Sequence, residues 1–79
     1  MAVQLFLAAT LRRHVRGYDA NTGHNVEVAT GFTVLDLAQQ VGLPAEEVKL
    51  IMVNGVAAKW DTVLQGDERV ALFPPVGGG

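Results

Sequence analysis

One segment of the sequence carries a full set of helix signals, and it limits the folds open to the chain. Thr33 is a favoured N-cap residue, and Asp36 three residues later completes a variant of the capping box. The apolar residues that follow share one helix face: Val34, Leu37, Ala38 and Val41. Gly42 supplies the left-handed stop. A lone amphipathic helix must bury its apolar face against another layer, which the rest of the 79-residue chain has to provide.

Short aliphatic or alternating segments on both sides of that helix indicate strands. The expected strands are residues 3–9, 26–29, 49–53, 56–58 and 68–73. A polar connection with one helical turn spans 10–25, and Asn54-Gly55 and Gly66-Asp67 favour tight turns. Two strands, a crossover helix and further strands predict an α+β domain, with a mixed four- to five-stranded sheet and one main helix packed on one face.

Composition and charge narrow the function classes. The chain is 49% hydrophobic and 18% charged, which is typical of a folded domain. Six Lys and Arg against eight Asp and Glu give a formal net charge of −2, which offers little for binding nucleic-acid phosphates. No apolar run approaches the ~18 residues of a membrane span. We therefore expect neither nucleic acid nor a membrane as partner, and a cytoplasmic location.

Residue types needed for metal or thiol chemistry are scarce. The sequence has no cysteine, which excludes a thiol nucleophile and cysteine-based zinc sites. His14 and His24 have no further ligand at metal-binding spacing, so we expect no metal site. Trp60 and Met52 are interpreted as packing residues, with Met52 in the core.

The last six residues combine a stiff segment with a narrow one. Pro74 and Pro75 cannot continue a paired strand. The three glycines that follow Val76 have no Cβ and fit a channel too narrow for other residues. Extended, 76–79 spans at most about 14 Å. The pattern predicts a folded domain at 1–75 and a flexible glycine tail at 76–79 that presents the Gly79 carboxylate to another protein.

The order of elements and several motifs resemble the ubiquitin-like sulfur-carrier family. The matching pieces are Val53-Asn54-Gly55, Gly66-Asp67, the run 70–76 and the final Gly78-Gly79. The family includes the thiamine-pathway carrier and the small subunit of molybdopterin synthase. The run Phe73-Pro74-Pro75-Val76 before the diglycine is the specific part, and it favours the molybdopterin-type branch. Gly77, a third glycine, and the long loop 17–25 depart from the usual pattern and leave a tungsten-pterin branch open.

The resemblance implies a β-grasp domain at 1–75 whose first and last strands are adjacent and parallel. It also implies a carrier rather than an enzyme, with no cofactor bound by the chain. An adenylating enzyme related to ubiquitin-activating enzymes would use ATP to convert the Gly79 carboxylate to an acyl-adenylate, with Gly78 part of the same site. A sulfur donor would displace AMP and leave a thiocarboxylate. The large subunit of molybdopterin synthase, or an equivalent acceptor, would then take the sulfur.

Two other kinds of function stay open from the sequence. A diglycine end equally suits a protein modifier, in which Gly79 forms an isopeptide bond with a lysine. The chain could also be an interaction module with an inert tail. Within the carrier class, the thiamine pathway is the alternative to molybdopterin or tungstopterin synthesis.

Strand alternation predicts the surface that docks partners. Phe6 and Phe73 fall on the side of the sheet away from the helix, since apolar residues of the other parity fill the core. We expect an exposed patch of Phe6, Phe73, Pro74 and Val76, with Pro75 and Gly77 also in the partner-binding segment. The alternative is that the loop 10–25 folds over the two rings. Further candidates for contacting an acidic partner are Arg12, Arg13 and Lys59.

Overall fold

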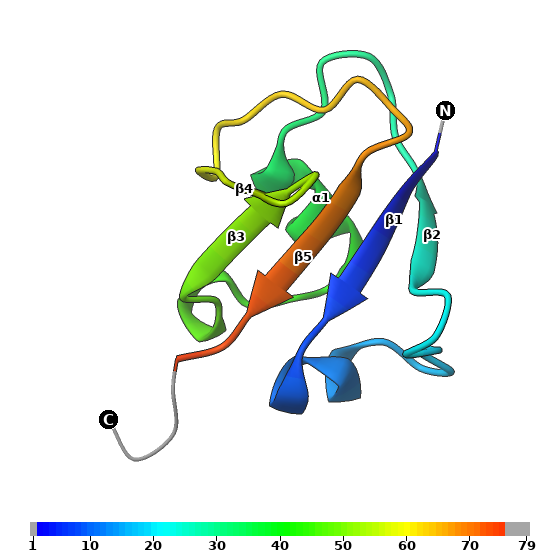
Figure 1. Cartoon of the computed structure of the whole chain (residues 1–79), viewed down its shortest axis with the longest axis vertical. Coiled ribbons are helices and arrows are strands. Elements are labelled where there is room, and N and C mark those ends of the chain that lie inside the picture. Colours follow the sequence, from blue (N-terminus) through cyan, green and yellow to red (C-terminus); the bar gives the residue numbers. More distant parts are fainter. Residues whose placement is uncertain (1, 76–79) are drawn as a thin grey trace.

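A five-stranded mixed sheet with one helix across its back forms the described part of the chain, residues 2–75 of a computed structural model (Figure 1). In chain order the elements are β1 (Ala2–Leu7), the 3-10 helix η1 (Ala9–His14), β2 (His24–Glu27), α1 (Val34–Val41), the 3-10 helix η2 (Ala45–Glu47), β3 (Leu50–Val53), β4 (Val56–Ala57) and β5 (Arg69–Phe73). This confirms the predicted α+β architecture, with the sheet at the upper end of the expected strand number.

The two strands nearest the ends of the chain lie side by side in the middle of the sheet. The strand order is β2-β1-β5-β3-β4, and β1 pairs in parallel with β5 from Gln4–Arg69 to Leu7–Leu72. The neighbours on either side are antiparallel: β2 to β1 and β3 to β5. The adjacent, parallel first and last strands that the family resemblance implied are therefore confirmed.

The core lies between α1 and one face of the sheet. From β1 and β5 it takes Val3, Leu5, Leu7, Val70 and Leu72, and from α1 it takes Val34, Leu37 and Ala38. All are buried, because residues of one parity on a strand point to one face. The predicted alternation of β1 and the apolar face of the helix are confirmed, although Val41 at the last position is only partly buried.

The start of α1 is secured by the connector that precedes β5. The first turn of any helix leaves amide groups without a partner inside the helix. Here the Val34 and Leu35 amides donate to the carbonyl oxygens of Thr62 and Trp60, both at 3.0 Å. The Asp36 amide donates to Thr33 Oγ1 at 3.1 Å, and the Thr33 amide donates to Asp36 Oδ2 at 3.0 Å. The predicted capping box is thus confirmed, and the connector is fixed to the helix.

The turn before β5 is held by a buried carboxylate. Glu68 is 9% exposed, and its two carboxylate oxygens accept from the amides of Gln65 at 2.7 Å and Gly66 at 2.8 Å. The Asp67 amide donates to the Ala2 carbonyl at 2.9 Å, which ties the same turn to the start of β1. Glu68 therefore fixes where β5 begins relative to β1.

Strand ends differ from the sequence prediction where the backbone turns sharply. The first strand stops at Leu7 rather than residue 9, because Ala9 has φ 49° and starts η1. The second begins at His24 rather than Val26 and ends at Glu27. As an edge strand, β2 accepts the polar residues His24 and Asn25, which pair with Leu5 and Gln4. The remaining strand ends shift by one residue at most.

We expect Thr33→Ala to lower the free energy of unfolding by about 1 kcal/mol, because the Asp36 amide loses its acceptor. Urea denaturation measures this loss. The control is Thr30→Ala, at an exposed position outside the helix, which should stay within about 0.5 kcal/mol of the parent. Equal losses in the two variants would contradict a role for the cap.

For Glu68→Gln we expect a loss of about 1–3 kcal/mol, because an amide replaces a charged acceptor that serves two backbone donors. Thermal unfolding measures the loss, and amide hydrogen exchange at Gln65 and Gly66 should accelerate. Glu46→Gln, on the exposed surface of η2, is the control. Unchanged exchange at both amides would contradict the role of the Glu68 carboxylate in holding this turn.

Candidate docking surface on the open face of the sheet

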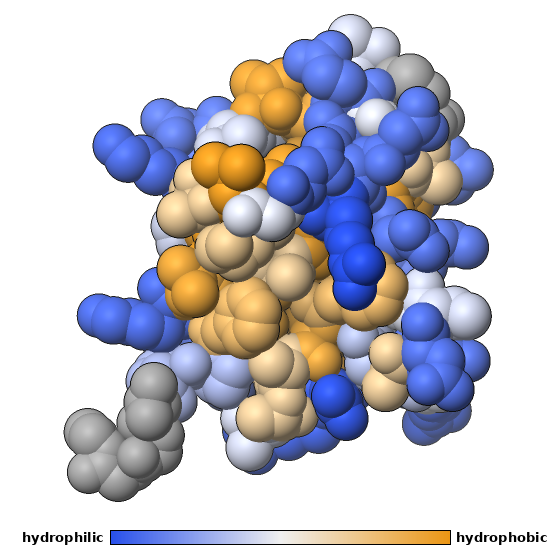
Figure 2. Space-filling model, viewed as in Figure 1, coloured by the Kyte–Doolittle hydropathy of each residue, from blue (hydrophilic) through white to orange (hydrophobic). Residues whose placement is uncertain are grey.

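The side of the sheet opposite α1 is open and largely apolar. Cross-strand pairing puts Phe6, Ala71 and Met52 in one row on this open face, since Phe6 pairs with Ala71 and Ala71 with Met52. Phe73 and Leu50 form the next row, and Leu50 is 44% exposed. Figure 2 views this face and shows an apolar area over β3 and β5. Such exposed apolar areas commonly mark protein interaction sites.

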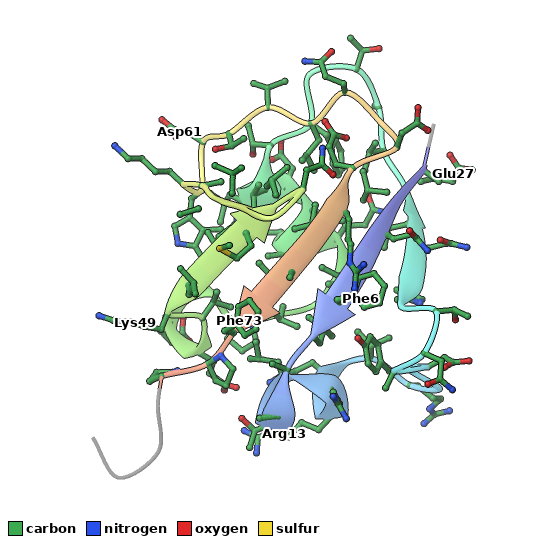
Figure 3. All side chains as sticks on the ribbon, viewed as in Figure 1. Phe6, Arg13, Glu27, Lys49, Asp61 and Phe73 are labelled. Carbon is green, nitrogen blue, oxygen red and sulfur yellow. The ribbon has the colours of Figure 1, made fainter. Side chains whose placement is uncertain are left out.

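Phe6 and Phe73 lie on this same open face, as the alternation predicted (Figure 3). Both rings are partly buried rather than fully exposed. The Arg69 guanidinium lies over the Phe6 ring, with Cζ 4.2 Å from the ring centroid. At the ring edge, a Cβ on Gly23 would lie 3.0 Å from Phe6 Cζ and from the Leu5 carbonyl oxygen. The predicted bare aromatic patch is therefore wrong at Phe6, which is flanked by Arg69 and by the loop 17–25.

The loop alternative is correct at one ring only. Gly23, at φ +74°, brings the loop against Phe6, and Tyr18 and Ala20 line a hollow beside it. Phe73 forms part of that hollow and of a second one toward β3, and no residue of 10–25 lines the second. The loop thus borders the open face without covering Phe73.

The surface continues to the point where the chain leaves the sheet. The Phe73 carbonyl accepts from the Lys49 amide at 2.8 Å, which is the last bond of β5 to its neighbour. Pro74 is partly buried and Pro75 exposed. The other predicted site residues, Val76, Gly77, Gly78 and Gly79, lie outside the described residues, as does the predicted tail 76–79. The docking and acyl-transfer roles assigned to all these residues stay predictions.

The structure separates the other candidates. Arg13 and His14 both contact Glu47 Oε1, at 3.5 and 2.8 Å, and join η1 to η2. Trp60 packs against the core, as predicted. Met52 is a correction: it is only partly buried and lies on the open face, because its strand neighbours Ile51 and Val53 take the helix side. Alternation along β3 was the available signal for this placement.

Sequence reasoning missed Tyr18 as part of the surface, and it named Arg12 only as a candidate for contacting an acidic partner. The Tyr18 hydroxyl accepts from the Leu7 amide at 2.8 Å, and Arg12 Nε donates to the Leu7 carbonyl at 3.0 Å. These bonds hold η1 and the loop against the end of β1. They link residues 5 and 11 positions apart, which no local pattern predicts.

Two kinds of feature are absent from the described residues, a metal-binding cluster and a membrane-spanning helix. Within 2–75, no group of three His, Cys, Asp or Glu side chains is placed to hold a metal ion. None of the helices in this part of the chain has the length and apolar character needed to cross a membrane. The open face instead combines exposed apolar area with two positively charged side chains, those of Arg12 and Arg69.

Comparisons with known proteins agree with this arrangement. The model of the ThiS family matches residues 10–79. Curated proteins give no significant match. Among solved structures, SAMP1 from Haloferax volcanii is 25% identical with a TM-score of 0.76, and the similarity covers 100% of both chains.

Two further solved structures share the fold at lower identity. The small archaeal modifier protein 1 of Haloferax volcanii is 22% identical, with a TM-score of 0.71 over 95% of this chain and 98% of that one. The putative molybdopterin converting factor, subunit 1, from Pyrococcus furiosus is 24% identical, with a TM-score of 0.69 over 96% and 99%. Together with the family match, they establish the β-grasp fold, and the chain belongs to the ThiS family of ubiquitin-like sulfur carriers and modifiers.

Proposed function

We propose that the chain is a sulfur carrier for molybdopterin or tungstopterin synthesis and that it acts through a thiocarboxylate at Gly79. The observation that carries the proposal is the position of the open face. Phe73 ends β5 on that face, and Pro74-Pro75 lead from it toward the glycines at 77–79 in the sequence. A partner that docks on the open face would therefore sit beside Pro74-Pro75, which the glycines follow in the sequence.

The chemistry requires two partner proteins and no catalytic residue of this chain. A carboxylate is a poor acyl donor, so the adenylating enzyme first joins a Gly79 oxygen to the α-phosphate of ATP and releases pyrophosphate. Sulfide from a sulfur donor then attacks the acyl carbon, the bond to AMP breaks, and the thiocarboxylate remains on Gly79. Docking the body of the carrier first confines the glycine segment near the enzyme's active site, which raises its effective concentration there. Gly78 and Gly77 would let the segment enter a narrow channel.

The pterin pathway is favoured by the motif that precedes the glycines. Phe73-Pro74-Pro75-Val76 followed by Gly78-Gly79 is the part of the sequence that resembles the molybdopterin-type branch. A fold-level neighbour named as a molybdopterin converting factor subunit is consistent with this branch. The acceptor would then be the large subunit of molybdopterin synthase or an equivalent protein. The ThiS family match keeps the thiamine pathway as the alternative within the carrier class.

A second candidate function is protein modification through Gly79. It is supported by the similarity to SAMP1 over 100% of both chains, since SAMP1 stands for small archaeal modifier protein 1. Activation by adenylation would be the same in both cases. The two functions differ only in what attacks the acyl carbon, a sulfur donor or the amine of a lysine side chain.

Intact-mass measurement of the chain purified from its native host tests the proposal. We expect a species in which one oxygen is replaced by sulfur, and we expect deletion of Gly79 to abolish it with little change in thermal stability. Gly77→Ala is the matched control, because it changes a glycine and leaves Gly78-Gly79 in place. Covalent adducts with other proteins would instead support the modifier, and an unmodified mass under all conditions would rule out both.

The docking role of the open face is tested by Phe73→Asp. We expect at least about a tenfold weaker complex with the co-purified adenylating enzyme, equivalent to about 1.4 kcal/mol, because a charge replaces an aromatic contact. Val56→Asp is the control, since Val56 is 67% exposed and pairs with Val53 on the helix side. Circular dichroism checks that both variants fold. Unfolding of the Phe73 variant alone would identify Phe73 as a core residue.

A further inference from the structure

Two guanidinium groups on the open face are held in place without a carboxylate. Arg69 lies over Phe6, and its backbone amide donates to Asn54 Oδ1 at 2.9 Å. Arg12 is fixed through Nε to the Leu7 carbonyl, and its Cζ lies 5.9 Å from the centroid of the Tyr18 ring. Ring contacts and backbone hydrogen bonds leave the charge of a guanidinium unneutralised. Both groups are therefore positioned to bind an anion.

The charges around these two groups favour an acidic ligand. Among residues 2–75, Glu47 contacts Arg13 and His14, and no carboxylate lies within ion-pair distance of Arg12 or Arg69. Both Arg12 and Arg69 line the hollow between β1 and β5, about 210 Å³ in volume, whose lining includes no Asp or Glu. The chain has eight acidic residues, so a lining of this kind does not follow from overall composition.

A small residue lies at the centre of the same surface. Ala71 has larger neighbours on every side of the open face. Across the strands these are Phe6 and Met52, and along β5 they are Arg69 and Phe73. Ala71 also lines both hollows, the one toward β1 and the one of about 540 Å³ toward β3. We call this arrangement the Ala71 socket. Its floor is a single methyl group and its walls are two rings, a thioether and a guanidinium.

We propose that the Ala71 socket binds a segment of a partner protein in which one large apolar side chain is flanked by carboxylates. The apolar side chain lies over Ala71, and the carboxylates pair with the guanidinium groups of Arg69 and Arg12. A guanidinium recognises a carboxylate through two parallel hydrogen bonds, which fixes orientation as well as charge. The inference rests on the proposed function, because it gives the chemistry of the partner surface that docks there.

The distribution of charge decides between this occupant and an apolar one. A purely apolar segment would leave two guanidinium groups at the edge of a dry contact, where an unpaired charge is costly. A purely apolar segment would also make no charge interaction with the Arg69 guanidinium that lies over the Phe6 ring. An acidic-apolar segment pairs the charges and fills the hollow together. Of the three basic residues that the sequence suggested for contacting an acidic partner, only Arg12 takes part, because Arg13 contacts Glu47 and Lys59 lines other hollows.

Nuclear magnetic resonance titration of the ¹⁵N-labelled full chain tests the socket. The probes are three acetylated, amidated pentapeptides with a central Phe: Ser-Glu-Phe-Glu-Ser, Ser-Gln-Phe-Gln-Ser and Ser-Lys-Phe-Lys-Ser. So small a contact is expected to bind with Kd of about 1 mM. We expect the Glu peptide to shift the amide signals of Phe6, Arg69, Ala71 and Phe73. The Gln peptide should bind several-fold more weakly and the Lys peptide weakest. Added salt should reduce the difference between the Glu and Gln peptides.

Variants of the chain test separately the apolar floor of the Ala71 socket and its guanidinium group. Ala71→Leu fills the floor and should abolish binding of the Glu peptide, and its side chain faces away from the core. Arg69→Glu should abolish the preference for the Glu peptide and serves as the second variant if Ala71→Leu does not fold. Arg16→Gln is the matched control, because Arg16 is exposed and lines a different hollow with His14 and His24. It should bind the Glu peptide like the parent.

Several outcomes would overturn the inference. They are equal binding of the Glu and Gln peptides, shifts that map away from the open face, and no shifts at all. Concentration-dependent shifts of the same residues without peptide would assign the face to a second copy of the chain instead. Deleting Gly79 should leave peptide binding intact. A chain that binds the Glu peptide but never carries sulfur would therefore refute the proposed function and not the socket.

Discussion

Parallel pairing of β1 with β5 is the constraint on which the rest of the structure depends. It places the two strands nearest the ends of the chain in the middle of the sheet, so one face of each must fill the core beneath α1. Their other faces then form the centre of the open side. The strand β5, which contributes Ala71 and Phe73 to the open face, runs directly into Pro74-Pro75, and the glycines follow in the sequence.

The open face differs from a simple apolar patch because long-range contacts shape it. Gly23 allows the loop to approach the edge of Phe6, and Arg69 covers part of the ring face. Two backbone bonds at Leu7 hold Arg12 and Tyr18 at the border. The free protein therefore presents fewer bare aromatic atoms than alternation alone suggests. A partner that docked on the open face would meet positive charge and apolar area at the same place, and charge complementarity contributes mainly to the specificity of binding.

The size of the domain is consistent with a role in recognition, with the reaction steps assigned to partner proteins. A domain of this size buries one core and has little material for a closed active site. The described residues supply a surface of fixed shape, while reaction steps on Gly79 would fall to larger partners. Stability and recognition are also separated, since the core residues of β1 and β5 have one parity and the open-face residues the other. Substitutions on the open face would therefore leave the core residues unchanged.

The sequence by itself determined the elements whose signals are local. The capping box, the helix face, the Asn54-Gly55 turn and the strand parities depend on residues a few positions apart, so their physics is contained in short segments. Tertiary structure alone decided which residues surround Phe6 and that Arg12 rather than Arg13 borders the open face. Those outcomes depend on contacts between distant segments, such as the approach of the loop 17–25 to Phe6, which cannot be derived from short stretches of sequence.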